Sequence, residues 1–392
     1  MAEFLFYILC FFPFISLQGS DSSDVQPYCL IYTIIMLIAT CMKEKICIDK
    51  KMYTLYRIII LGILVGCAAT IILDGFDFSG ILRYLATYCG LILISYVSYN
   101  ICLKNEGLNE KLTKIIINIW LLVGMIQTFV SREFCSNFIA NARTTANRGV
   151  IGLASEPSFY GYMCIFFALL VLEFQTQKIF YWLNLLFQIV FLAKSTTTVL
   201  YLIILLGIIG LFFVLKGGLK RTVIFLMVTV SLITGCMYFV EHADSGQRIV
   251  YFLKILFSGR GISGLIGQFG ADGSIRIRVR DIWICIEGFI DYLGFPHGFH
   301  TKKISSGYGS ILYTMGWVGV IIIIYLYKLI RSAFENEMIQ KIVPTFLTII
   351  LFSAIQLSNP IIGFILGFYM YKRKILCAEG KTNYINGNEV VK

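Results

Sequence analysis

Long apolar segments separated by short polar connections make up most of the chain. Twelve apolar segments fall at residues 4–18, 28–42, 53–73, 81–103, 113–131, 159–174, 179–193, 197–215, 222–240, 309–330, 342–357 and 360–371. They lack the alternation of apolar and polar positions that strands show, so the pattern predicts helices. A helix of about 20 apolar residues crosses a bilayer, and lipid offers no hydrogen bonds to free backbone groups. We therefore predict an all-α, polytopic integral membrane protein with about twelve transmembrane helices.

One polar interruption is much longer than the others and divides the chain. Residues 1–240 hold a predicted transmembrane bundle of about nine spans, and residues 309–371 hold the C-terminal spans. Between them, residues 241–308 are expected to form a large loop, and residues 372–392 a polar tail. Within the loop, Asp281–Leu293 has apolar and charged positions on different faces of a helix. This pattern predicts an amphipathic helix that lies at the membrane surface.

Composition supports a membrane protein and argues against a disulfide scaffold. Of the 392 residues, 58% are hydrophobic and 14% are charged, whereas soluble domains have about 25% charged residues. Most of the 12 cysteines lie in or beside apolar segments, and none form a CxxC pair. They are therefore expected to act as small apolar side chains. The start Met1-Ala2-Glu3 lacks the basic region of a signal peptide, so the first segment is expected to be a retained span.

The distribution of basic residues predicts the orientation of the chain. Of the 33 lysines and arginines, 20 lie in alternate connections and the C-terminal tail. Positive connections face the cytoplasm, so both termini are expected there. The other side holds 13 basic residues, and 11 of these lie in two loops, 132–158 and 241–308. External loops usually carry fewer basic residues than cytoplasmic ones. This concentration of positive charge therefore favours a negatively charged ligand at the outer surface.

Arg276, Arg278 and Arg280 bring three guanidinium groups within five residues, on one face if the segment is extended. Because guanidinium binds phosphate with two hydrogen bonds, the three arginines are candidates for holding a phosphate or pyrophosphate. Contact with lipid headgroups is the alternative. The amphipathic helix that follows would keep these arginines at headgroup depth.

Two histidines and one carboxylate are candidates for proton transfer. His297 and His300 could act as base and acid or as metal ligands, although no third metal ligand can be assigned, and solvated loop histidines are the alternative. Glu156 precedes Pro157 at the start of a predicted helix. The positive end of the helix explains an acid there, and a general base for a sugar hydroxyl is the alternative explanation.

Lys194 lies in a very short external turn, where it could contact phosphate or reach lipid headgroups. The segment Gly259–Gly264 matches GxGxxG, but no strand–helix–strand unit surrounds it, so a dinucleotide site is not expected. Walker, GxSxG and HExxH motifs are missing from the chain. Nucleotide-driven transport and hydrolase chemistry are therefore disfavoured.

Several short motifs, together with the expected topology, point to one family. They are Arg278 and Arg280 ahead of Trp283, the turn Gly294–Phe299, Ser306 followed by Gly316-Trp317-Val318-Gly319, the turn Lys194-Ser195, and Glu156-Pro157-Ser158-Phe159. The chain resembles the Wzy/WaaL superfamily of membrane polysaccharide polymerases and O-antigen ligases, which have about twelve spans, one large periplasmic loop and a GT-C-like fold. Ligases carry a histidine where this chain has Ser305. The resemblance therefore favours a Wzy-type polymerase, with a ligase or a lipid-linked oligosaccharide flippase or other transporter as alternatives.

The resemblance implies a glycosyltransferase in the bacterial inner membrane. Such an enzyme moves a growing glycan from undecaprenyl pyrophosphate onto another lipid-linked repeat unit, without a cofactor, metal or nucleic acid. The bilayer, the lipid-linked oligosaccharide, a chain-length-regulating co-polymerase and the repeat-unit flippase are its expected partners. Glu156, or else His297 or His300, would take the acceptor proton, and Arg280, also a candidate catalytic residue, would hold the pyrophosphate. The implied pyrophosphate and glycan contacts are Arg276, Arg278, Arg260, Arg248, Lys194 and Arg148.

Overall fold

Residues 2–16, 23–41, 48–73, 78–144, 149–216, 223, 227, 273–299, 304–353 and 355–379 are described by the structure, which is a computed structural model. This part of the chain contains 13 α-helices and no strand, with one isolated β-bridge between Ile15 and Ile139. The predicted all-α class is therefore confirmed for the described residues. Three helices are long and apolar enough to cross a membrane, namely α3 (Lys50–Leu73), α4 (Phe78–Lys104) and α5 (Glu110–Phe129).

Apart from α12, which lies within the predicted loop 241–308, each of the remaining helices overlaps a predicted apolar segment. The N-terminal ones are α1 (Ala2–Phe11), α2 (Tyr28–Cys41), α6 (Pro157–Val171), α7 (Lys178–Phe187) and α8 (Thr196–Lys216). A 3-10 turn lies at Ser136–Phe138, and a π-helical segment, Gln188–Ala193, continues α7. The C-terminal helices are α12 (Gly273–Asp291), α13 (Gly307–Met315), α14 (Trp317–Arg331), α15 (Glu337–Phe352) and α16 (Pro360–Ala378). Except for residues 223 and 227, the predicted segment 222–240 lies outside the described residues, as do residues 241–272 and 300–303 of the loop 241–308.

Several helix boundaries differ from the prediction. Helix α1 ends at Phe11 rather than at residue 18, and α12 begins at Gly273, ahead of the predicted amphipathic helix Asp281–Leu293. The apolar segment 309–330 forms two helices, because the chain breaks at Gly316, where φ is 55°. A side chain at this glycine would overlap with the main-chain oxygen of Gly294, so the break is needed for close packing. Helix α16 continues past the predicted apolar segment 360–371 to Ala378.

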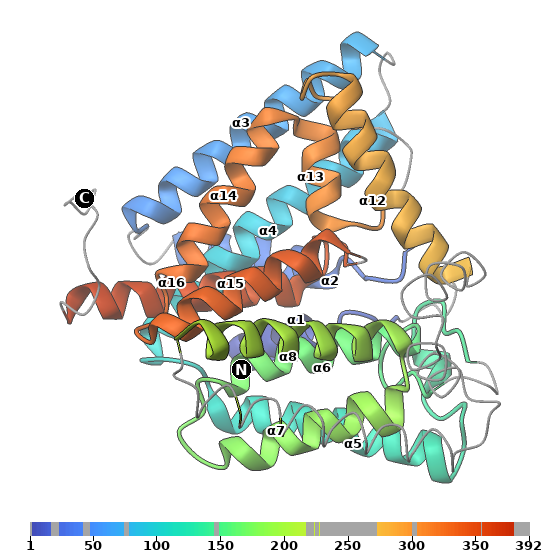
Figure 1. The fold of residues 1–392 in the computed structure, drawn as a ribbon. Helices are drawn as coiled ribbons and strands as arrows, with labels where there is room; N and C mark the ends of the chain where they lie inside the picture. The colour runs from blue at the N-terminus through green and yellow to red at the C-terminus, as the bar shows by residue number, and fades with distance from the viewer. Residues whose placement is uncertain are drawn as a thin grey trace. The chain divides into compact units, whose positions relative to one another are not determined.

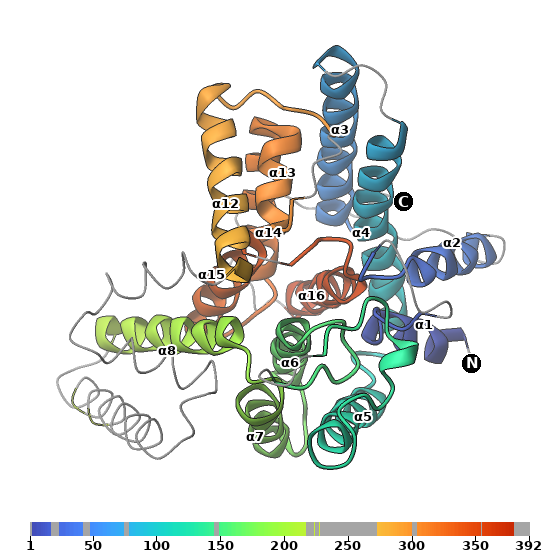
Figure 2. The ribbon, with the colours of Figure 1, turned by 90° about the vertical axis from the view of Figure 1, so that its right-hand side faces the viewer.

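The described chain divides into two compact units. The first unit comprises residues 1–13, 25–113 and 278–392. Within it, α16 packs along α4 (Figure 2), where a side chain at Gly367 would overlap with the main-chain oxygen of Ser95. The hydroxyl of Ser98 donates to the main-chain oxygen of Phe364 at 2.9 Å. Small residues thus let these two helices approach closely, as is common between helices in lipid.

The second unit comprises residues 14–24 and 114–277. It holds most of α5 together with α6, α7 and α8 (Figure 1), and Figure 2 shows α5, α6 and α7 beside one another. Trp120 of α5 is fully buried and stacks on Tyr160 of α6, with 5.5 Å between ring centroids. Tyr160 also donates its hydroxyl to Oε1 of Gln188 at 2.9 Å. These buried contacts make α6 the centre of the unit and fix the position of its N-terminus.

Candidate functional site

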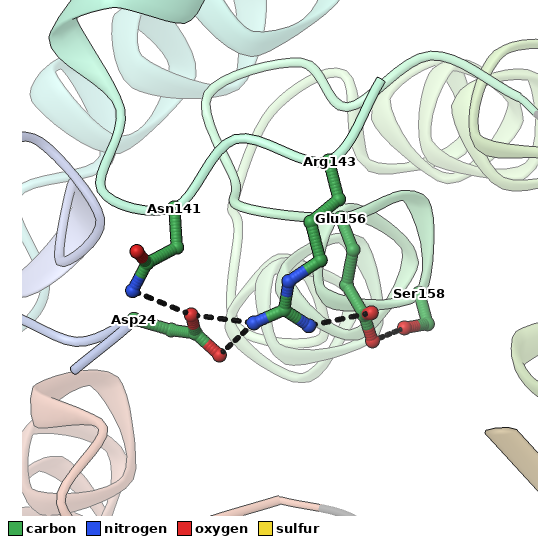
Figure 3. A network of polar contacts seen from close by, with 5 residues as sticks. All are labelled: Asp24, Asn141, Arg143, Glu156 and Ser158. Atoms are coloured by element: carbon green, nitrogen blue, oxygen red, sulfur yellow. Dashed lines mark hydrogen bonds and ion pairs between the residues drawn. The ribbon is translucent and has the colours of Figure 1, made fainter. Parts of the chain in front are cut away.

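A chain of polar contacts in the second unit joins segments that are far apart in the sequence (Figure 3). Nη2 of Arg143 donates to both carboxylate oxygens of Asp24, at 2.7 and 2.8 Å. Nη1 of Arg143 donates to Oε2 of Glu156 at 3.1 Å. Nδ2 of Asn141 donates to Oδ1 of Asp24 at 3.3 Å, and the hydroxyl of Ser158 donates to Oε1 of Glu156. We call these five residues the Arg143 network.

The start of α6 determines the direction of the Glu156 side chain. Glu156 is the extended residue before the helix, with φ −151° and ψ 160°, and Pro157 is the first helical residue. Proline suits this position because its φ is already helical and it has no N–H to satisfy. The Glu156 side chain makes no capping hydrogen bond to its own helix. Its carboxylate is therefore available to Arg143 and Ser158.

Main-chain pairing brings the other two charged residues to the same place. Residues 14–16 pair with residues 138–140, through bonds of 2.8 and 2.9 Å on either side of the bridge between Ile15 and Ile139. This pairing holds the segment that leads to Asp24 against the loop that carries Arg143. The main-chain N–H of Arg143 then donates to the oxygen of Ser155 at 2.8 Å, which ties the loop to the start of α6.

A buried glutamine holds the loop that precedes Glu156. The side chain of Gln127 accepts from the N–H of Gly152 at 2.7 Å and donates to the oxygens of Gly152 and Phe134, both at 2.8 Å. Gly152 has φ 58°, a conformation that favours glycine. Because Gln127 is only 2% exposed, these bonds form away from water and rigidify the loop.

The Arg143 network combines two sheltered carboxylates with a half-exposed guanidinium. The side chains of Asp24 and Glu156 are 12% and 11% exposed, whereas that of Arg143 is 48% exposed. With all three groups ionised, two negative charges face one positive charge. Glu156 therefore presents a carboxylate in a fixed orientation, and Arg143 keeps one side open to solvent. The arrangement can accept a proton and hold an anionic group at neighbouring positions.

Lys194, which the sequence predicts as a phosphate contact, lies at the same end of the second unit as the loop before α6. It has φ 43° and forms the turn between the π-helical segment and α8. Val150 donates its N–H to the oxygen of Leu192 at 2.9 Å, and a side chain at Gly149 would overlap with the main-chain oxygen of Ala193. These contacts pack the loop directly against the turn. The ammonium of Lys194 forms no ion pair with any described residue.

His297 belongs to the first unit and is held by aromatic packing. Its side chain is buried between the rings of Tyr292 and Tyr313, at centroid distances of 4.1 and 4.2 Å. Its main-chain N–H donates to the oxygen of Tyr313 at 3.0 Å. The next residue, Gly298, packs against the backbone of Thr70 in α3. The geometry gives His297 a packing role, and its predicted part in proton transfer stays a prediction.

Arg276, Arg278 and Arg280 would share one face only in an extended segment, and their backbone is helical within α12. Positions 276 and 280 are roughly 40° apart around a helix, whereas position 278 lies on the opposite side. Five alternating residues are too few to distinguish a strand from a helix, and the helix satisfies their backbone hydrogen bonds without a partner strand. The α12 backbone therefore separates one of the three arginines from the other two.

Beside Arg280 lies the carboxylate of Asp281, which is not among the predicted site residues. Arg280 is exposed and lies 3.6 Å from the carboxylate of the buried Asp281. Oδ2 of Asp281 accepts from the N–H of Ser305 at 3.0 Å and from its hydroxyl at 2.7 Å. Asp281 therefore anchors the start of the segment that leads into α13.

Several predicted residues lie outside this geometry. His300, Arg148, Arg248 and Arg260 lie outside the described residues, as do the side chains of Arg276 and Arg278. Of the predicted residues that are described, Glu156 and Lys194 lie in the second unit, and Arg280 and His297 in the first. No group of three or more histidine, cysteine, aspartate or glutamate side chains within the described ranges could hold a metal ion.

Arg143 and Asp24 are not among the residues predicted from the sequence. Both are charged residues in expected external loops, and their charge is the only local signal of a role. They are 119 positions apart, so nothing in the sequence around either one indicates the pair. Comparison of the chain with models of known families, with curated proteins and with solved structures finds no match.

Proposed function

We propose that the chain is a multi-pass glycosyltransferase of the bacterial inner membrane that polymerises undecaprenyl-pyrophosphate-linked O-antigen repeat units on the periplasmic face. The proposal rests on the resemblance to Wzy-type polymerases and on the three membrane-capable helices. The single observation that carries it is the Glu156 carboxylate, oriented by Ser158 and by the half-exposed Arg143 in a loop expected to face the periplasm.

In the proposed reaction, a hydroxyl of the acceptor sugar attacks the anomeric carbon of the donor glycan. A new C–O bond forms as the bond from that carbon to the pyrophosphate oxygen breaks, and undecaprenyl pyrophosphate leaves with the bonding electrons. Glu156 takes the hydroxyl proton. Arg143 and the cations of the external loops stabilise the charge that develops on the pyrophosphate. The leaving group is a stable anion, so the protein mainly positions two lipid-linked chains and supplies the base.

The proposal also covers topology and partners. About twelve spans would place both termini in the cytoplasm and the loops 132–158 and 241–308 in the periplasm. The lipid-linked oligosaccharide would enter from the bilayer, supplied by the repeat-unit flippase, and a chain-length-regulating co-polymerase would act beside the enzyme.

A lipid-linked oligosaccharide transporter is the second candidate, and one observation favours it. The apolar run that forms α13 and α14 is interrupted at Gly316, and transporters often build their substrate sites from such discontinuous helices. An O-antigen ligase is less favoured, because Ser305 is hydrogen bonded to Asp281 where ligases carry histidine.

Deletion of the gene in its host, followed by a gel of surface lipopolysaccharide, separates the three functions. Loss of a polymerase leaves one repeat unit on the core, and loss of a ligase leaves none. Loss of a flippase leaves none and holds intermediates inside. A ladder of normal length after deletion would overturn the proposal.

Complementation with variants then tests the proposed base. Wild-type protein should restore the ladder, whereas E156Q should leave one repeat unit at a normal protein level. E133Q is the matched control, because Glu133 is an exposed residue of the same loop and the chemical change is the same. A full ladder from E156Q would remove Glu156 from the mechanism.

A further inference from the structure

A buried guanidinium lies in the first unit where the C-terminal part of α16 meets the start of α3. Arg373 donates from Nη1 to Oδ2 of Asp49 at 2.6 Å, and its side chain is only 10% exposed. Nε of Arg373 is buried and has no hydrogen-bond partner within the described part of the chain. A buried donor without a partner is costly, so the guanidinium has an unmet need for an acceptor in the folded chain.

The residue paired with Arg373 also caps a helix. Asp49 directly precedes α3, and its Oδ2 accepts from the main-chain N–H of Lys51 at 3.3 Å. Its main-chain oxygen accepts from the N–H of Tyr53 at 2.8 Å. The guanidinium of Arg373 is thus directed at the N-terminal end of α3. Helix N-termini carry partial positive charge and attract anions.

Positive charge exceeds negative charge at this place. Lys51 is an exposed residue that interacts electrostatically with both Arg373 and Asp49. Its ammonium forms no hydrogen bond or ion pair with any described residue. The hydroxyl of Tyr325 in α14 donates to the main-chain oxygen of Lys51 at 3.0 Å. This bond holds α14 beside the start of α3. Among the described residues, two cations and a helix N-terminus therefore face one carboxylate.

We propose that Lys51, Arg373 and the N-terminal end of α3 form a binding site for a phosphate group. A guanidinium and an ammonium beside a helix N-terminus match the charge and hydrogen-bonding needs of phosphate oxygens. Because α3 is long enough to cross a membrane, its end lies at the depth of lipid headgroups. The phosphate is that of an anionic phospholipid headgroup or of a free phosphate ion, which share this chemistry. The site does not depend on the proposed enzymatic function.

Native mass spectrometry of the full chain tests the site. The protein is purified into phosphatidylcholine nanodiscs and titrated either with phosphatidylglycerol or with inorganic phosphate. Retention of phosphatidylglycerol alone identifies a headgroup site, and binding of inorganic phosphate identifies a site for the free ion. Failure of both probes to bind overturns the proposal.

Three variants separate a defined site from general attraction to anionic lipid. K51Q should weaken binding about fivefold, because one cation near a membrane surface contributes a factor of about five. D49N removes the competing carboxylate but keeps a good helix cap, so it should tighten binding. K341Q is the matched control, because Lys341 already pairs with Glu337 at 3.1 Å.

The two site variants should therefore change affinity in opposite directions, and the control should leave it unchanged. Equal weakening by K51Q and K341Q would overturn the site in favour of diffuse charge. Weaker or unchanged binding in D49N would also overturn it, because Asp49 would then serve only to join α3 and α16. Both substitutions lie at helix ends, and thermal unfolding of each variant checks that the fold is retained.

Discussion

Replacing Arg143 by glutamine removes the only described cation that bonds both Asp24 and Glu156. The two carboxylates are nearly buried, at 12% and 11% exposure, and would be left close together without their shared partner. A hydrogen bond to a charged group contributes about 1.5–3 kcal/mol, although solvent screening of the half-exposed Arg143 lowers that value. Allowing for this screening, we take about 1 kcal/mol for the two-bond contact with Asp24 and about 1 kcal/mol for the contact with Glu156, so R143Q should lower the free energy of unfolding by roughly 2 kcal/mol.

A double-mutant cycle isolates the contact between Asp24 and Arg143. D24N leaves Arg143 paired with Glu156 and should cost about 1 kcal/mol. Because the two substitutions remove the same bonds, D24N/R143Q should cost less than the sum of the single variants, with a coupling energy of about 1 kcal/mol. The assay is unfolding of the full chain in mixed micelles by titration with sodium dodecyl sulfate. E133Q combined with R143Q is the control pair, and its effects should add.

Additive effects of D24N and R143Q, within about 0.3 kcal/mol, would refute this reasoning. The Asp24 segment would then not be bonded to the Arg143 loop in the folded protein. A cost of D24N larger than that of R143Q would also contradict it, because loss of the shared cation must be the more severe change.

Three further predictions concern packing and exposure. G149A should prevent accumulation of the protein, because a side chain there would overlap with the main-chain oxygen of Ala193, and an immunoblot tests this. G207A has open space around it and should be neutral or stabilise α8 by up to about 1 kcal/mol, which an unfolding measurement tests. H297F should retain the protein level and polymerisation, because an aromatic ring still packs between the two tyrosines, whereas H297A should lower the protein level. Loss of the ladder in both variants at a normal protein level would instead support a catalytic role for His297. Burial raises the pKa of the Cys135 thiol, so a membrane-impermeant maleimide added outside spheroplasts should label this thiol faster at pH 9 than at pH 7. Labelling of Cys135 only after lysis would contradict the predicted periplasmic position of its loop.

The helices could be predicted from the sequence because each apolar segment has to satisfy its own backbone hydrogen bonds. Their interruptions could not. The break at Gly316 depends on the approach of Gly294, which belongs to a different segment and leaves no trace in the local apolar pattern. The helical backbone of residues 276–280 was equally hidden, because alternating arginine and aliphatic residues fit an extended strand as well.

The position of Glu156 directly before a helix could be predicted, because proline at residue 157 is favoured at the first helical position. The partners of Glu156 could not be predicted, because Arg143 is bonded to a carboxylate 119 positions away. The same reason hides the pair of Arg373 and Asp49, which are 324 positions apart. By composition, Arg373 belongs to a basic tail, and only the structure shows that it is buried. Contacts between distant segments are set by packing, whereas periodicity and charge patterns report only on neighbours in sequence.

We propose that this chain joins lipid-linked repeat units and that Glu156 takes the acceptor proton. The most direct measurement uses purified protein in proteoliposomes, supplied with undecaprenyl-pyrophosphate-linked repeat units extracted from the deletion strain. Wild-type protein and E133Q should produce a ladder of joined units and release undecaprenyl pyrophosphate, and E156Q should produce neither. Repeat units that stay single with the wild-type protein, or that are moved across the bilayer without being joined, would contradict the account.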